Sequence, residues 1–181
     1  MSASSDFIPV NIAVLTVSDT RTLDTDTSGQ TLIDGLESAG HKLADRKLIK
    51  DDIYQVRAII SQWIASADVE AILITGGTGF SSRDTTPEAV LPLLDKQIEG
   101  YGELFRQISF RDIGTSTVQS RAVGGLANNT VIFCMPGSTN ACKTAWGEII
   151  REQLDSRHKP CNFVKQITAA RLALENCGTR G

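Results

Sequence analysis

Residues 72–88 read ILITGGTGFSSRDTTPE, and this stretch decides the fold. An apolar run stops at a loop with three glycines in positions 76–79, where the backbone can turn its N–H groups toward an anion. Thr86, Pro87 and Glu88 then have the pattern of a helix start, with a hydroxyl cap, a proline at the first helical position and an early acidic side chain. The segment therefore predicts a strand, a loop that can bind an anion through its N–H groups, and a helix N-terminus, in that order.

The same alternation of strand and helix continues in both directions along the chain. Residues 10–17 and 130–135 are apolar and rich in β-branched side chains, which is typical of parallel strands buried on both faces, and 43–49 is a weaker strand. We therefore predict an α/β fold of three layers, αβα, with a mainly parallel central sheet. The predicted organisation is an N-terminal extension over 1–9, a single domain over 10–163 and a loose or partly helical tail over 164–181.

Helix starts are predicted from local capping patterns. Thr27 begins a capping-box spacing, and either Asp51 or Asp52 is placed to cap the next helix. Two further helices are expected over 87–95 and 102–110, with a glycine between them at position 100. The stretch 114–125 has no clear assignment, and apolar surface on the segment 100–125 is a candidate for contacts between subunits.

The composition excludes several classes of function. The chain has 181 residues and a net charge of −3, which argues against a broad basic surface and against nucleic-acid binding. Four cysteines without a CxxC pair, and only two histidines, argue against a zinc site and indicate reduced thiols in the cytoplasm. Neither a signal peptide nor a membrane-spanning run is present. We expect Trp63, Trp146 and Cys134 in the core and His41 at the surface.

Three polar or glycine-rich loops follow predicted strands, over 18–28, 76–86 and 136–138. In open α/β sheets such loops converge on a ligand crevice at the carboxyl ends of the strands. The candidate phosphate-binding amides are those of Gly76, Gly77, Thr78 and Gly79, and a plain tight turn is the alternative. Ser18 and Asp19 lie where the first strand meets the crevice, and Arg83 either pairs with a phosphate or is solvated.

Five motifs together resemble one family. TVSD at 16–19, DTSG at 26–29, GGTGFSSRDTTPEA at 76–89, SRAVGG at 120–125 and MPGS at 135–138 are similar to the MoaB/MogA family of molybdopterin-binding proteins of molybdenum cofactor synthesis. The resemblance covers about residues 7–163, and the segments GTSTVQSRAV and PGSTNACKTAW place the chain nearest the MoaB branch. It implies an enzyme that joins the terminal phosphate of molybdopterin to the α-phosphate of ATP with Mg²⁺, releasing pyrophosphate. It also implies a homotrimer, or a hexamer of two trimers, and contacts with other proteins of the pathway.

The resemblance also assigns roles to individual residues. Asp84 matches an acidic residue of the family that organises Mg²⁺ or the ATP phosphates, although it could instead cap the following helix. Asp51 matches a second acidic residue, a catalytic and metal-binding position, with helix capping as the alternative. Lys50 replaces the proline that precedes this residue in adenylylating members. Because of that departure, a second function is considered: binding of molybdopterin or a precursor without catalysis.

Further residues match the family's ligand-binding motifs. Ser138, behind Pro136 and Gly137, resembles a residue of the pterin site, although it could simply be the N-cap of its helix. Ser120 and Arg121 match another motif, and an arginine there suits an anion. An unrelated nucleotide-phosphate module is a weaker third possibility, because the lysine of a P-loop is missing.

Overall fold

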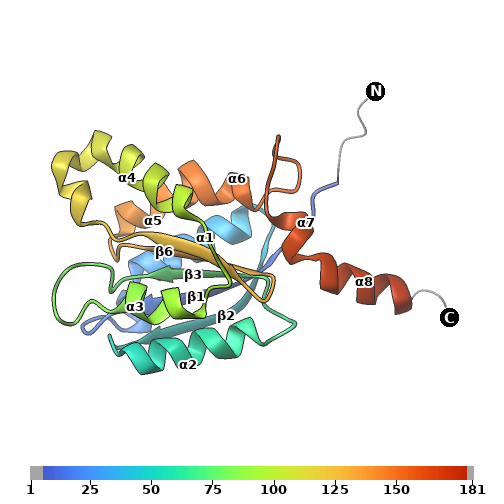
Figure 1. Cartoon of the computed structure of the whole chain (residues 1–181), viewed down its shortest axis with the longest axis horizontal. Helices are drawn as coiled ribbons and strands as arrows, with labels where there is room; N and C mark the ends of the chain where they lie inside the picture. Colours follow the sequence, from blue (N-terminus) through green and yellow to red (C-terminus); the bar gives the residue numbers. More distant parts are fainter. Residues whose placement is uncertain (1–5, 179–181) are drawn as a thin grey trace.

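The computed structural model describes residues 6–178. Six strands form one sheet in the order β2-β1-β3-β6-β5-β4, seen edge-on in Figure 1. The first four strands in this order are parallel to one another, and β5 pairs antiparallel with both of its neighbours, β6 and β4. The α/β prediction with a mainly parallel sheet is therefore confirmed. The strands are β1 (Asn11–Val17), β2 (Lys42–Ile49), β3 (Ala71–Thr75), β4 (Lys96–Gln97), β5 (Val123–Ala127) and β6 (Thr130–Met135).

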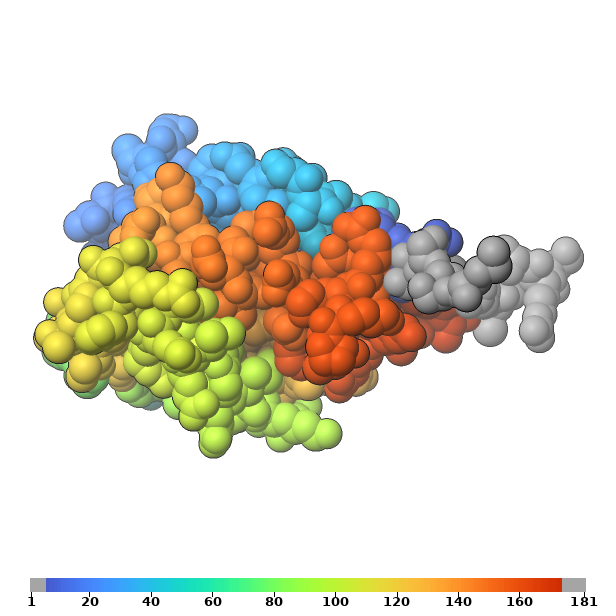
Figure 2. Space-filling model, turned by 90° about the horizontal axis from the view of Figure 1, so that it is seen from above, coloured from blue at the N-terminus to red at the C-terminus, as the bar shows by residue number. Residues whose placement is uncertain are grey.

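Helices cover both faces of the sheet. One face is covered by α1 (Thr27–Ser38), α4 (Glu99–Ile113), α5 (Thr139–Ala145) and the π-helical segment Trp146–Ile150. Helix α6 (Arg151–Gln153) continues this π-helical segment. These elements lie side by side in blue, yellow-green and orange in Figure 2. The opposite face is covered by α2 (Ile53–Ile64) and α3 (Thr86–Val90).

The strand pattern follows from this layering. In β1 the side chains of Ile12 and Val14 belong to one core cluster, and those of Ala13 and Leu15 belong to the other. Alternate residues of a strand point to opposite faces, so a strand covered on both sides must be apolar at every position. This accounts for the continuous apolar run from which the strand was predicted. Cys134, Trp63 and Trp146 are buried as expected.

The segment between β3 and β6 departs most from the prediction. The expected helix over 87–95 ends at Val90 and is followed by the 3₁₀ turn Leu91–Leu93 and by β4. Gly100 lies inside α4 and does not separate two helices. Neither β4 nor β5 was predicted, because β4 has two exposed residues and β5 carries two glycines that weaken a strand pattern. Asn128 and Asn129 form the turn that joins β5 to β6, with positive φ at both residues.

Two local predictions about the α1 region are wrong. The N-cap of α1 is Asp26, whose carboxylate accepts from the N–H of Gly29, and Thr27 is already helical. His41 is buried, since its ring lies between Phe7 and Trp146 and its Nδ1 accepts from the N–H of Val10 at 3.2 Å. Burial lowers the pKa of His41, because a charged imidazolium would lose its hydration there.

The chain remains folded beyond the predicted domain boundary at 163. Helix α7 (Val164–Ile167) buries Val164 and Ile167 in the core, and α8 (Ala169–Gly178) follows it. Residues 1–5 of the predicted extension and 179–181 of the predicted tail, and the side chain of Cys177, lie outside the described residues. Within residues 6–178 no helix has the length and apolar character needed to cross a membrane.

Candidate functional site

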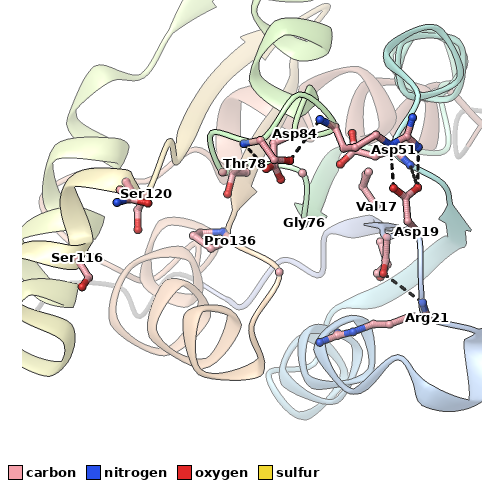
Figure 3. Close-up of a pocket in the computed structure, with 18 residues that line it drawn as sticks. Val17, Asp19, Arg21, Asp51, Gly76, Thr78, Asp84, Ser116, Ser120 and Pro136 are labelled. Carbon is pink, nitrogen blue, oxygen red and sulfur yellow. Dashed lines mark hydrogen bonds and ion pairs between the residues drawn. The ribbon is translucent and has the colours of Figure 1, made fainter.

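A cleft of about 610 Å³ opens at the carboxyl ends of the central strands. The register aligns Thr16 of β1, Thr75 of β3 and Met135 of β6, so the loops after these strands leave the sheet at one level. Figure 3 shows the lining side chains around this opening. The lining residues are Thr16, Val17, Ser18, Asp19, Arg21, Asp51, Gly76, Gly77, Thr78, Gly79, Ser81, Arg83, Asp84, Ser116, Gln119, Ser120, Pro136 and Gly137.

The glycine loop forms the floor of the cleft, and its first two glycines are required by geometry. Gly76 has φ +102°, and a Cβ atom there would lie 2.0 Å from the carbonyl oxygen of Val17. Gly77 has φ +63°, and a Cβ atom would lie 2.3 Å from the hydroxyl oxygen of Thr86 and 2.7 Å from Oδ2 of Asp51. Only glycine therefore fits at positions 76 and 77.

Thr86 stabilises this loop and does not cap the next helix. Its hydroxyl donates to the carbonyl oxygen of Gly76 at 2.8 Å, and its N–H donates to that of Gly77 at 2.9 Å. Thr85 occupies the N-cap position of α3 and makes no side-chain capping bond. The predicted cap at Thr86 is therefore wrong, although the proline at the start of the helix is correct.

Arg121 holds the loop from outside the cleft. Its Nε donates to the carbonyl oxygens of Thr78 and Gly79, its Nη2 donates to that of Asp84, and its Nη1 pairs with Glu88. These contacts draw the loop carbonyls toward the guanidinium. Arg121 does not line the cleft, so here its charge supports the loop that a ligand would contact.

Asp51 and Asp84 both reach the cleft, and neither caps a helix. Asp52 caps α2, accepting from the N–H groups of Tyr54 and Gln55, which settles the alternative between the two neighbours. Asp51 is 7% exposed and accepts from the N–H and hydroxyl of Thr85; burial raises the pKa of Asp51. Asp84 accepts from the N–H of Ser81 at 2.9 Å, and hydrogen bonding from Ser81 lowers the pKa of Asp84.

Asp19 joins two walls of the cleft. It accepts two hydrogen bonds from Arg83, at 2.9 and 2.8 Å, and one from the N–H of Asp51 at 3.2 Å. The Arg83 pair, with the Asp51 amide, lowers the pKa of Asp19 from 3.8 to about 2. Since the folded-state pKa is the lower one, the contact favours folding above pH 4 and is lost as the pH falls toward 2. Arg83 is therefore not simply solvated: its Nε and Nη2 pair with Asp19, and its side chain lines the cleft.

Twelve of the predicted site residues line the cleft, and Arg121 and Ser138 do not. Ser138 caps α5, accepting from the N–H of Ala141 at 3.1 Å, and lines a neighbouring cavity of about 80 Å³ that shares Ser120 and Pro136 with the cleft. Sequence reasoning missed Thr16, Val17, Arg21, Ser81, Ser116 and Gln119. Arg21 lies within a predicted cleft loop, so its position was a usable signal, whereas Ser116 and Gln119 lie in the unassigned stretch.

The chemistry of the donors fits a hard cation such as Mg²⁺. Carboxylate, hydroxyl and backbone oxygens line the cleft, without sulfur or imidazole, and Mg²⁺ prefers oxygen ligands. Among residues 6–178 no group of three or more His, Cys, Asp or Glu side chains converges as a complete metal cage. Mg²⁺ commonly binds through one or two carboxylates and completes its shell with water and substrate phosphates. Asp51 and Asp84 are the carboxylates that could serve in this way.

Comparison with known proteins identifies related sequences. A family model described as "Probable molybdopterin binding domain" matches residues 13–156. The chain is 57% identical over 160 residues to molybdenum cofactor biosynthesis protein B of Escherichia coli K12, covering 88% of this chain and 94% of that one. It is 46% identical over 146 residues to the protein of the same name from Halalkalibacterium halodurans, covering 80% and 86% of the two chains.

Solved structures show the same fold. A crystal structure of a molybdenum cofactor biosynthesis protein B matches with a TM-score of 0.79 and 44% identity, over 81% of this chain and 92% of that one. The tungsten cofactor synthesizing protein MoaB from Pyrococcus furiosus matches with a TM-score of 0.73 and 33% identity, over the same shares of the two chains.

Proposed function

Because this chain belongs to the molybdopterin-binding domain family that includes molybdenum cofactor biosynthesis protein B, we propose that its cleft binds molybdopterin and adenylylates it with ATP and Mg²⁺. The names of the relatives support a place in molybdenum cofactor biosynthesis. Within the described residues Cys134, Cys142 and Cys161 are free thiols, which supports a reducing compartment such as the cytoplasm.

The proposal depends mainly on two carboxylates that lie against the glycine loop. Oδ2 of Asp51 and Oδ2 of Asp84 lie 2.7 and 2.8 Å from where the Cβ atoms of Gly77 and Gly79 would be. A phosphate at this loop would meet these carboxylates as well as the loop backbone, and like charges repel at such separations. A divalent cation held by Asp51 and Asp84 would supply the missing positive charge, as Mg²⁺ does in phosphoryl transfer.

The proposed reaction forms one P–O bond and breaks another. A phosphate oxygen of molybdopterin attacks the α-phosphorus of ATP, the bond from that phosphorus to the bridging oxygen breaks, and pyrophosphate leaves with the electron pair. Such transfers need alignment and charge neutralisation more than covalent participation by the protein. The chain's part is to place the acceptor at the glycine loop and to keep Asp51 in position through Asp19 and Thr85.

A second candidate is binding of molybdopterin, or of a precursor, without adenylyl transfer. Two observations favour it. Lys50 replaces the proline of adenylylating members, and Asp51 is buried and already accepts two hydrogen bonds from Thr85. Both features would weaken Asp51 as a ligand for a cation.

Pyrophosphate release separates the two candidates. Incubation of the purified protein with molybdopterin, ATP and Mg²⁺ is expected to release pyrophosphate, and omission of any one of the three should reduce release to background. Molybdopterin binding without release would support the second candidate. Absence of both binding and release would contradict the assignment of the cleft.

We also propose that copies of this chain assemble as a homotrimer or as a hexamer of two trimers. Apolar side chains are exposed on α4 and on the following 3₁₀ turn Gly114–Gln119, and α4 extends past the end of the sheet in Figure 1. The side chains are Leu104, Phe110, Ile113 and Val118, the last of which is 73% exposed.

Sedimentation tests the assembly. The natural protein is expected to sediment as a trimer or hexamer, and Val118→Glu should shift it toward monomer because a charge would be buried in the interface. Tyr54→Glu is the matched control, since Tyr54 is 74% exposed on α2, away from this surface. A natural protein that remains monomeric would contradict the proposal.

A further inference from the structure

Two arginines line the cleft, and the protein uses their donors to different extents. Arg83 directs Nε and Nη2 to the carboxylate of Asp19. Arg21 donates from Nη1 to the hydroxyl oxygen of Ser28 at 2.6 Å, and the same nitrogen lies 3.5 Å from Oδ1 of Asp26. Within residues 6–178 its Nε and Nη2 make no hydrogen bond, so Arg21 keeps donors available at the cleft.

The carboxylate behind Arg21 is buried and shared. Asp26 is 2% exposed and accepts from the hydroxyl of Thr16 at 2.7 Å, from the N–H of Gly29 at 2.9 Å and from Nη2 of Arg46 at 3.2 Å. Arg46 therefore provides a counter-charge for Asp26. One carboxylate and two guanidinium groups leave a formal charge of +1 on this cluster, so Arg21 keeps positive charge for a ligand.

The position of Arg21 divides the cleft into two chemically different sides. Arg21 lies beside α1, whereas Thr78 and Asp84 lie across the opening in the glycine loop, as Figure 3 shows. Ser28, which holds Arg21, also donates to the carbonyl oxygen of Gly137 at 2.8 Å, so the arginine is fixed to the loop after β6. The glycine-loop side carries the carboxylates of Asp51 and Asp84 together with Arg83, which is paired with Asp19, whereas the α1 side carries a guanidinium with available donors.

We propose that Arg21 is an anion-binding residue of the cleft and that Asp26 is a positioning residue that holds it there. The ligand group is a phosphate of a nucleotide polyphosphate, because a guanidinium with adjacent N–H donors matches phosphate oxygens. This inference rests on the proposed function, since the cleft is the same. It adds a second point of attachment for the anionic substrate, opposite the glycine loop.

Calorimetric titration with ATP and Mg²⁺ tests the role of Arg21. Arg21→Gln is expected to weaken ATP binding about tenfold or more, and Arg21→Lys should weaken it less, since the charge remains. Arg157→Gln is the matched control, because Arg157 is an exposed arginine that lies outside the cleft and pairs with Asp155. ATP binding by this variant should equal that of the natural protein. Equal binding by Arg21→Gln and the natural protein would overturn this inference alone. Absence of ATP binding by the natural protein would overturn the proposed function as well.

A double-mutant cycle tests the role of Asp26. Asp26→Asn should weaken ATP binding about tenfold in the natural background and have no further effect in the Arg21→Gln background. If Asp26 had only a structural role, Asp26→Asn would weaken ATP binding equally in both backgrounds. That result would overturn the positioning role of Asp26. Because Asp26 also caps α1, Ser28→Ala provides a second cycle that removes a contact to Arg21 and leaves the buried carboxylate in place. If Asp26→Asn does not fold, the Ser28 cycle tests by the same criterion whether Arg21 must be held in position to bind ATP, and equal weakening in both backgrounds would overturn the positioning of Arg21.

Discussion

Gly76→Ala is expected to destabilise the protein by about 3 kcal/mol, the combined effect of a strained backbone and a steric clash. The φ of +102° at Gly76 lies outside the regions that alanine adopts readily, and the new Cβ atom would lie 2.0 Å from the carbonyl oxygen of Val17. That oxygen cannot easily move aside, because Val17 ends β1 and the next residue, Ser18, is hydrogen-bonded to Ile49. The strain therefore falls on the junction between two central strands.

Urea unfolding measures this effect, and Gly100→Ala is the matched control. Gly100 is exposed in α4, and a Cβ atom there would meet nothing within 4 Å. The control should be neutral or more stable by up to about 1 kcal/mol, because alanine favours helix. Equal unfolding midpoints for Gly76→Ala and the natural protein would show that the loop geometry is wrong.

Asp84→Asn is expected to reduce pyrophosphate release by about 100-fold or more while the fold is retained. The substitution keeps the shape of the side chain and an oxygen that can accept from the N–H of Ser81, so the loop should persist. It removes the negative charge that the proposed cation would require beside the glycine loop. The loss should therefore appear in the rate, with a change in unfolding free energy of about 1 kcal/mol or less.

Asp52→Asn is the control for this substitution. Asp52 is a half-buried N-cap beside Asp51, and asparagine caps helices as well as aspartate does. Both its activity and its stability should match those of the natural protein. Full activity in Asp84→Asn would contradict a role in cation or phosphate binding. Unfolding of Asp84→Asn under the assay conditions would instead identify Asp84 as a structural residue of the loop.

Much of the site could be predicted because it depends on local patterns and one topological rule. Apolar runs over β1, β3 and β6 predicted a parallel sheet, and the carboxyl ends of such strands meet at one edge. This rule brought Asp19 and Asp84 to the same cleft from two separate loops, whereas Asp51 was assigned through the family resemblance. Placement of these residues needed no knowledge of their side-chain partners.

The partners themselves could not be predicted. Arg83 and Asp19 are 64 positions apart, and Arg121 holds carbonyl oxygens more than 35 positions earlier. The sequence around an arginine does not show whether its guanidinium donates to a ligand, to a carboxylate or to the carbonyl oxygens of a loop. For this reason Arg121 was assigned to the ligand, and Arg21 was missed.

The amino-acid order alone was enough for the layered α/β fold, for the glycine loop and for the placement of Asp19 and Asp84 beside the cleft, because periodicity and glycine conformation act over a few residues. Folding in three dimensions assigned the remaining roles: His41 to the core, Arg121 to the loop, Arg83 to Asp19 and Arg21 to the cleft. These assignments depend on which donors and acceptors meet across long sequence separations, and that distance information exists only once the chain has folded.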